Sequence, residues 1–317
     1  MTIDWDYRIS FMQNIDKIIN GKMYADNLLR EISPLINQYS KKFLRSPCLA
    51  VILVGENSAS KIYVKNKLIT AEKNNIKSIE IKLPLDITEE YLLNEIFKLN
   101  EDKNVDGILV QLPLPTHISE KKIIQSIDPL KDVDGFHPNN FGRLFMGDPN
   151  FIPCTPLGCL YVLKKELKEL DGKNAVIIGR SNIVGKPMAS LLLSSNCTVT
   201  IAHSKTKNLK EHCKNADILI SAVGRPEMID ETYIKPDAII IDVGINRLEL
   251  NNIKTNEKKY KLVGDIKFEK VIDVAKKITP VPGGVGPMTI ACLMHNTVKA
   301  AYINKHENFV NIIEGSL

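Results

Sequence analysis

The sequence predicts an α/β protein built from two domains, each containing a mainly parallel sheet. Short apolar runs alternate with segments of helical spacing along most of the chain, and this alternation is typical of parallel sheets covered by helices. The length of 317 residues fits two domains of roughly 150 residues each. Proline-rich breaks at 151–156 and 279–287 are candidate domain boundaries. A small-molecule site in a cleft between two domains is therefore expected.

The predicted strands are short, rich in Val, Ile and Leu, and bounded by Gly, Asp or Asn, as expected of strands covered on both faces. They are residues 49–54, 107–111, 175–178, 198–202, 218–222 and 238–243. Predicted helices span 58–74, 89–100, 187–195 and 287–301. The last has Pro287 in its first turn, where the missing N–H costs nothing. The Lys- and Asn-rich stretch 251–261 is expected to be a solvated loop or a hairpin tip.

Composition argues against several classes of protein. Hydrophobic residues make up 44% and charged residues 25%, an ordinary globular mixture, and no apolar run approaches the roughly 18 residues of a membrane span. The net charge of +5 is dispersed and aromatic residues make up only 6%, so no nucleic-acid partner is expected. The cysteines form no C-x-x-C pair and the histidines no HExxH motif, which favours buried, reduced thiols over a metal site. Residues 1–14 resemble neither a secretory signal nor a transit peptide, so a cytoplasmic protein is expected, with an organelle as the alternative.

Residues 175–187 combine a strand, a glycine loop and a helix start. That order surrounds an incoming phosphate with free backbone N–H groups and the positive end of a helix dipole. It is not a Walker loop, because Gly179 and Gly185 are one residue too far apart and Pro187 stands where Ser or Thr would bind magnesium. It also departs from the usual dinucleotide fingerprint, since Ser181 occupies the second glycine position. The pattern favours a phosphate site, with a plain strand–helix turn as the alternative.

The strand after the glycine loop ends in His203-Ser204-Lys205. A site selective for NAD would place an acidic residue here to bind the ribose 2′-hydroxyl. This chain has no acid at that point, and Arg180 lies in the glycine loop. A guanidinium with Ser204 and Lys205 suits a 2′-phosphate, so the sequence favours NADP over NAD; the alternative is that Arg180 only caps a helix or solvates the loop.

Tyr63 and Lys67 lie four residues apart in a predicted helix, so they share one face and can act on one ligand. Burial lowers the pKa of a lysine, which makes it a usable base or proton shuttle near neutral pH. An exposed amphipathic face is the alternative. Short-chain dehydrogenases use the same spacing after their glycine loop, whereas here the pair precedes Gly179 by more than a hundred residues, which argues against that family.

Three further segments place polar or flexible residues where ligands bind. Gln111 ends a predicted buried strand, at the edge of a parallel sheet that usually carries the site. Asp132 and Asp134 lie in a turn and could bind magnesium, but without a third ligand a single anchoring aspartate is favoured. The glycine-rich segment 280–287 either brings main chain close to a ligand or forms a strained turn between domains.

Together these segments resemble the bifunctional methylenetetrahydrofolate dehydrogenase/methenyltetrahydrofolate cyclohydrolase family. The blocks that carry the resemblance are VGENSASKIYVKNK, DGILVQLPLP, KDVDGFHPNNFGRL, FIPCTPLG, AVIIGRSNIVGKPMASLLL, AHSKT, DVGIN, LVGDI and TPVPGGVGPMTIACLM. They occur in the family's order between about residues 15 and 301. One departure is Asn75, where relatives commonly have Gly, and it implies a changed helix end.

The resemblance implies a folate-binding catalytic domain at 15–155, completed by a C-terminal helix within 288–317, and a Rossmann-type NADP-binding domain at 156–287. It implies tetrahydrofolate derivatives as substrates and a homodimer. The implied catalytic residues are Tyr63, Lys67, Gln111 and Asp134, and the substrate site adds Val110, Leu112, Pro282, Gly283, Gly284, Val285 and Gly286. The implied NADP site holds Gly179, Arg180, Ser181, Ser204 and Ile245, and no metal ligand is implied.

The resemblance also implies the chemistry. NADP would oxidise 5,10-methylenetetrahydrofolate to the methenyl compound, which water would convert to 10-formyltetrahydrofolate. Lys67 would move the proton, Gln111 would hold Lys67, Tyr63 would pack on the pterin and Asp134 would accept its N–H groups. Two alternatives are a monofunctional NAD(P) dehydrogenase and a non-catalytic folate- or nucleotide-binding relative.

Overall fold

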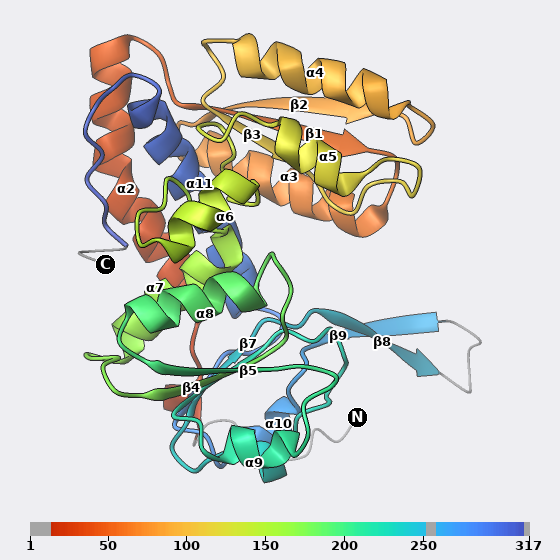
Figure 1. Cartoon of the computed structure of the whole chain (residues 1–317), viewed down its shortest axis with the longest axis vertical. Coiled ribbons are helices and arrows are strands. Elements are labelled where there is room, and N and C mark those ends of the chain that lie inside the picture. Colours follow the sequence, from red (N-terminus) through yellow and green to blue (C-terminus); the bar gives the residue numbers. More distant parts are fainter. Residues whose placement is uncertain (1–13, 252–257, 314–317) are drawn as a thin grey trace, which may run out of the picture. The chain divides into compact units, whose positions relative to one another are not determined.

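The computed structural model describes residues 14–251 and 258–313, and the chain divides into two compact units (Figure 1). Among the described residues, the β1–β3 unit contains 25–158 and 289–313, and the β4–β10 unit contains 14–24, 159–251 and 258–288. The chain passes from one unit to the other within three helices, α2 (Gly21–Phe43), α7 (Cys154–Glu166) and α11 (Val285–Ile303).

The β1–β3 unit has a parallel sheet in the order β2-β1-β3, formed by β2 (Lys77–Leu83), β1 (Cys48–Val54) and β3 (Gly107–Val110). Every residue of the central strand β1 is buried, which its uninterrupted apolar sequence explains. The helices are α3 (Ser58–Lys73), α4 (Glu89–Glu101), α5 (Glu120–Ser126) and α6 (Pro138–Phe145). Alternate residues of β1 and β3 form a core with Leu92 and Ile96 of α4 and Ile123 of α5.

Helix α3 has clear sequence signals at both ends. The Asn57 side chain accepts hydrogen bonds from the backbone N–H groups of Ala59 and Ser60 and so caps the first turn. At the other end Asn75 adopts a left-handed backbone with φ of 57°, a conformation that Gly and Asn tolerate best. The buried positions are Ser60, Val64, Lys67 and Ala71. Their spacing of three or four residues makes one face, so Lys67 points inward with the apolar side chains.

The β4–β10 unit has a five-stranded parallel sheet in the order β10-β7-β6-β4-β5. Its strands are β4 (Asn174–Ile178), β5 (Thr198–Ala202), β6 (Ile218–Ser221), β7 (Ile239–Asp242) and β10 (Lys277–Ile278). The helices are α8 (Gly185–Ser194), α9 (Leu209–Lys214) and α10 (Phe268–Val271), with 3₁₀ turns η1 (Ile15–Lys17) and η2 (Glu231–Tyr233). The chain leaves β4 for β5 on one side and returns to β6 on the other, so the strand order reverses at β4. In such sheets ligands bind at the carboxyl ends of the strands beside that switch point.

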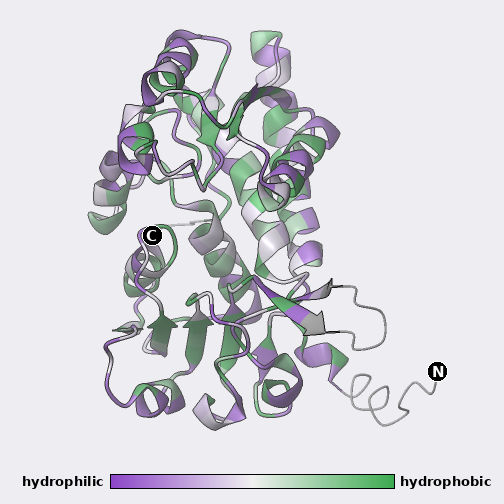
Figure 2. Ribbon diagram, turned by 90° about the vertical axis from the view of Figure 1, so that its right-hand side faces the viewer, coloured by the Kyte–Doolittle hydropathy of each residue, from purple (hydrophilic) through white to green (hydrophobic). Residues whose placement is uncertain are grey.

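All six predicted strands are confirmed to within one residue at each end, and the four predicted helices to within two. Figure 2 shows that the strands of the β4–β10 sheet are mainly hydrophobic. Their apolar runs in the sequence therefore predict these strands. Around the stretch 251–261, β8 (Asn246–Asn251) and β9 (Lys258–Val263) form an antiparallel hairpin. Residues 258–261 therefore belong to a strand rather than a loop, because they pair with β8, and 252–257 lie outside the described residues.

All six cysteine thiols are buried and none is in a disulfide. Within residues 14–251 and 258–313, none of the helices combines the length and the apolar character that crossing a membrane requires.

Candidate active site

Helix α3 and the end of β3 bring the predicted lysine and glutamine together. The Lys67 side chain is buried, with 7% of its surface exposed, and its Nζ donates a hydrogen bond of 3.0 Å to Oε1 of Gln111. Tyr63 lies one turn earlier on α3 and is half-buried, and burial raises the pKa of its hydroxyl. The interpretation of this helix as a merely solvated face is wrong for Lys67, because its side chain is buried.

Gln111 is held in one orientation by its own surroundings. Its backbone N–H donates to the carbonyl of Ile52 (2.9 Å), which extends the β1–β3 pairing by one residue. Its side-chain Nε2 donates to the carbonyl of Leu112 (2.7 Å). An ammonium can only donate, so the amide must present its oxygen to Lys67. The predicted residues Val110 and Leu112 flank this position and are buried and half-buried.

Asp134 belongs to the same site as Lys67. Burial raises the pKa of its carboxyl, and the positive charge of Lys67 and a hydrogen bond from the Cys154 thiol oppose that rise. The carboxyl is thus close enough to the ammonium of Lys67 to feel its charge. The structure therefore gathers Lys67, Gln111 and Asp134, which are far apart in sequence, within one unit.

Two residues that the sequence did not single out as functional hold Asp134 in place. Asn296 of α11 is buried, and its Nδ2 donates to the carbonyls of Val133 (2.9 Å) and Ile152 (3.0 Å). Gly135 has φ of +72°, and a Cβ there would lie 2.8 Å from the carbonyl carbon of Ile152, so only glycine fits. Asn296 is remote from Val133 in sequence, and no local pattern could have revealed this contact.

Asp132, considered above as half of a magnesium pair, is a structural residue. Its carboxylate accepts hydrogen bonds from the backbone N–H of His137 (2.8 Å) and from Nδ2 of Asn140 (2.9 Å). Burial raises its pKa to about 6. These contacts connect the turn that carries Asp134 to the start of α6.

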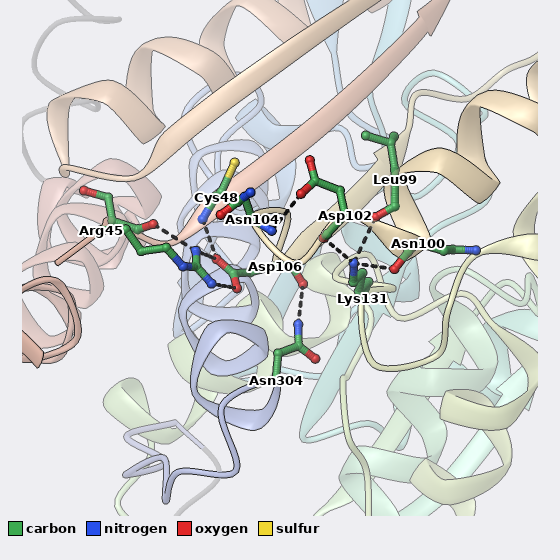
Figure 3. Close-up of polar contacts among 10 residues, drawn as sticks. Arg45, Cys48, Leu99, Asn100, Asp102, Asn104, Asp106, Lys131 and Asn304 are labelled. Carbon is green, nitrogen blue, oxygen red and sulfur yellow. Dashed lines mark hydrogen bonds and ion pairs between the residues drawn. The ribbon is translucent and has the colours of Figure 1, made fainter. Parts of the chain in front are cut away.

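A polar network anchors the start of β3 and the segment before Asp134 (Figure 3). The buried Lys131 donates from Nζ to the carbonyls of Leu99 (2.9 Å), Asn100 (2.6 Å) and Asp102 (2.8 Å) around the C-terminus of α4, where a helix dipole favours a cation. Alongside it, Arg45 makes two hydrogen bonds to the carboxylate of Asp106, at 2.8 and 2.7 Å. Charge-assisted hydrogen bonds thus hold the start of β3 through Asp106 and the turn before Asp134 through Lys131.

In the β4–β10 unit the glycine loop is tightly folded. Gly179 has φ of +127°, and a Cβ there would collide with the carbonyl oxygen of Ala222 after β6. A Cβ at Gly185 would collide with the carbonyl oxygen of Gly179. The Ser181 hydroxyl accepts from the backbone N–H groups of Val184 (3.2 Å) and Gly185 (3.4 Å). Ser181 therefore ties the glycine loop to the residues at the start of α8.

Three predicted residues follow strands of this sheet at its carboxyl edge. Ile178 of β4 pairs with Ala202 of β5, so Arg180 and Ser204 each lie two residues beyond paired positions. Both are exposed. Ile245 follows β7 and is 49% exposed. A guanidinium, a hydroxyl and an apolar side chain thus follow strands at one edge of one sheet.

The predicted segment 282–286 leads into α11. Gly283 has φ of 102°, and a Cβ at Gly284 would lie 2.5 Å from the carbonyl oxygen of Pro280. Pro282 is exposed, whereas Gly284 and Val285 are buried. Glycine is therefore required here by the path of the chain itself, and this segment belongs to the β4–β10 unit.

A cavity of about 810 Å³ lies beside the opposite face of α3. Its lining includes Lys61, Lys65 and Glu72 of α3 and Lys77, Glu80 and Lys82 of β2. At 100° per residue these helix positions lie across the helix from Tyr63. The cavity is therefore separate from the Lys67 site.

The chain matches the models of both domains of one protein family. The catalytic domain of the tetrahydrofolate dehydrogenase/cyclohydrolase family matches residues 19–134, and its NAD(P)-binding domain matches residues 153–305. The bifunctional protein FolD of Ehrlichia canis is 53% identical over 296 residues, 92% of this chain and 97% of that protein. FolD of Wolbachia pipientis is 54% identical over 289 residues, 91% of this chain and 96% of that protein.

Two solved structures have the same fold. The FolD methylenetetrahydrofolate dehydrogenase/cyclohydrolase of Campylobacter jejuni is 47% identical with a TM-score of 0.84, covering 90% of this chain and 98% of that one. The Trypanosoma brucei enzyme, solved with NADP and an inhibitor, is 34% identical with a TM-score of 0.84, covering 90% and 96%. With both domains matched and near relatives aligned over almost their whole length, this chain belongs to the bifunctional tetrahydrofolate dehydrogenase/cyclohydrolase family.

Proposed function

We propose that this chain oxidises 5,10-methylenetetrahydrofolate with NADP to 5,10-methenyltetrahydrofolate and hydrolyses that product to 10-formyltetrahydrofolate, with Lys67 as the proton carrier. The observation that carries the assignment of Lys67 is its buried side chain, whose Nζ is hydrogen-bonded to Gln111 at 3.0 Å and whose charge influences the pKa of Asp134. Family membership supports both reactions.

In the dehydrogenase step, a hydride leaves the bridging carbon with its electron pair for the nicotinamide of NADP, and the folate becomes a methenyl cation. This transfer depends on holding the two reactants face to face more than on an acid or base. The half-buried ring of Tyr63 packs along the pterin and fixes its angle. The carboxyl of Asp134 accepts hydrogen bonds from the pterin amino group and ring N–H, a pair of donors that a carboxylate matches.

In the cyclohydrolase step, water attacks the methenyl carbon, a proton leaves that water, and a ring nitrogen is protonated as its bond to carbon breaks. One side chain that can both accept and donate a proton serves this step. Lys67 has that capacity, and Gln111 holds its Nζ in one place through the 3.0 Å hydrogen bond. Val110, Leu112 and the main chain of 282–286 complete our assignment of the folate-binding residues.

The residues that suit NADP are Gly179, Arg180, Ser181, Ser204 and Ile245. Because Gly179 has no side chain, the loop after β4 folds tightly against Ala222, and the backbone N–H groups at the start of α8 can bind a pyrophosphate. The exposed Arg180 and Ser204, which follow paired strands, suit the 2′-phosphate that distinguishes NADP from NAD. Ile245, half exposed after β7, offers an apolar surface to the nicotinamide.

The test compares Lys67→Met with Lys65→Met, a matched change on the exposed face of α3. Both activities are followed with purified protein: methenyl formation from the methylene compound and NADP, and disappearance of methenyl absorbance. We expect Lys67→Met to lose methenyl hydrolysis by at least about 100-fold, the usual contribution of a general acid–base group, while still binding NADP. Lys65→Met should match the parent. Parental hydrolysis by Lys67→Met would remove the proposed role.

We also propose a cytoplasmic homodimer. The six unpaired thiols are typical of a reducing compartment. Leu193 of α8 and Ile201 of the edge strand β5 are 65% and 40% exposed, and apolar surface of this kind suits an interface between two copies. Light scattering after size exclusion should give twice the chain mass of 35.6 kDa, and the monomer mass at micromolar concentration would contradict the dimer.

A further inference from the structure

Two buried carboxylates lie behind the carboxyl edge of the β4–β10 sheet. Asp242 ends β7 and Asp265 follows β9 by two residues, and their exposed fractions are 3% and 0%. The backbone N–H of Asp265 donates to Oδ1 of Asp242 at 3.0 Å. Buried charges are costly unless hydrogen bonds compensate them. The hydrogen-bond donors around this pair therefore identify the loops that the two carboxylates fix in position.

Asp265 accepts hydrogen bonds from the backbone of the loop that follows β6. Its Oδ2 accepts from the backbone N–H groups of Val223 (2.7 Å) and Gly224 (3.3 Å), and its Oδ1 accepts from that of Arg225 (2.9 Å). Three consecutive backbone donors thus converge on one carboxylate. Because Ala222, the residue before them, contacts Gly179 closely, the carboxylate fixes this loop against the glycine loop.

The same carboxylate also holds the segment that follows β7. Oδ1 of Asp265 accepts a hydrogen bond of 2.9 Å from Nδ2 of Asn246, the residue after Ile245. A Cβ at Gly244 would collide with the Asp265 carboxylate, so glycine is required there. Asp242 completes the connection by accepting from the N–H groups of Gly244 (3.0 Å) and Ile266 (2.9 Å).

We propose that Asp265 is a positioning residue of the dinucleotide site, which sets the loops after β6 and β7 against the glycine loop. The inference rests on the proposed NADP site and adds a residue outside it. The reason is geometric: Ala222 borders Gly179 and Asn246 adjoins Ile245, so a shift of either loop moves residues assigned to the cofactor. Asp265 acts on binding through these loops and needs no contact with the cofactor.

A carboxylate suits this position better than an amide of the same shape. It presents acceptors on both oxygens, whereas an amide presents one acceptor and one donor group. In Asp265→Asn, an NH₂ would face either the N–H groups of Val223 and Gly224 or those of Arg225 and Asn246. One loop must then move away or leave its donors unsatisfied.

The matched control is Asp217→Asn, at the opposite edge of the same sheet. Asp217 precedes β6, and its carboxylate also accepts from a backbone N–H, that of Asn174 (2.9 Å), and from Nζ of Lys235 (2.6 Å). Like Asp265, it accepts hydrogen bonds that hold a segment next to the end of a strand. It lies, however, at the amino ends of the strands, whereas ligands bind at the carboxyl ends.

The experiment measures NADPH binding by fluorescence titration, the KM for NADP, and methenyl hydrolysis, a step that consumes no dinucleotide. For Asp265→Asn we expect at least about tenfold weaker NADPH binding, as for loss of a hydrogen bond to a charged group, and a KM for NADP raised to match. Hydrolysis should stay within about twofold of the parent because Lys67, Gln111 and Asp134 lie in the other unit. Asp217→Asn should leave NADPH binding unchanged.

Unchanged NADPH binding by Asp265→Asn would overturn the proposal, as would an equal loss in Asp217→Asn or an equal loss of hydrolysis. If Asp265→Asn does not fold, Asn246→Ala removes one donor to the same carboxylate and should weaken NADPH binding by about threefold or more; no change would also overturn the proposal. A parent enzyme that fails to bind NADPH would refute the proposed NADP site instead.

Discussion

Replacing Gln111 by Met separates the two chemical steps most sharply. Gln111→Met keeps a side chain of similar length but removes the Oε1 that accepts the 3.0 Å hydrogen bond from Lys67. A hydrogen bond to a charged group contributes about 1.5–3 kcal/mol, and every 1.4 kcal/mol is about tenfold. If this hydrogen bond keeps Nζ in place for proton transfer, methenyl hydrolysis should fall by about 10- to 150-fold. Hydride transfer should fall less, because it needs no proton carrier.

The assay follows methenyl absorbance in two formats, hydrolysis of the methenyl compound alone and NADP-dependent formation of it. Gln125→Met is the matched control, because Gln125 is exposed on α5 in the same unit and its side chain has no assigned role. The ratio of hydrolysis to oxidation should drop in Gln111→Met and stay parental in Gln125→Met. Hydrolysis within threefold of the parent, with an unchanged ratio, would refute the reasoning.

Three further results are expected. Arg180→Ala should weaken NADP binding by about 10- to 100-fold, as for loss of a charge-assisted contact, and leave NAD binding nearly unchanged; equal losses would contradict the assignment. Burial raises the pKa of Asp242 from 3.8 to about 7, so between these values the folded protein binds a proton that the unfolded chain has released. The free energy of unfolding, measured in urea and compared with that of Asp242→Asn, should therefore fall from pH 5 to pH 7 by up to about 1.4 kcal/mol per unit; a constant difference would contradict this. Asn75→Ala should lower that free energy by about 1 kcal/mol, because alanine must adopt φ of 57°, whereas Asn75→Gly should not lower it.

Four of the predicted strands, β1, β3, β6 and β7, are buried at every residue. The edge strand β5 is not, and its β-branched residues predict it instead. Every residue of β1 is buried, so its sequence is apolar throughout and the pattern is unambiguous. The edge strand β2 mixes exposed, half-buried and buried positions in KSIEIKL, so it lacks the continuous apolar run that identifies β1. Helix α2 contains Pro34, which interrupts a helical pattern in sequence, so the sequence does not predict this helix either.

The candidate site was predictable where short motifs carry it. Lys67 and Gln111 come from recognisable blocks, and the structure joins them by a hydrogen bond. Asn296 and Asp265 were not predictable, because each acts on main chain far away in sequence. Their hydrogen bonds exist only once helices and strands have packed, and neither residue has an informative local pattern.

The most direct test of the account is a crystal structure of the parent enzyme with a methylenetetrahydrofolate analogue and NADP bound. The account predicts that Nζ of Lys67 lies within hydrogen-bond reach, roughly 2.6–3.2 Å or one water molecule away, of the carbon bridge or its ring nitrogens, with Asp134 on the pterin. A structure in which Nζ of Lys67 points to bulk solvent and the bridge lies against other side chains would contradict it.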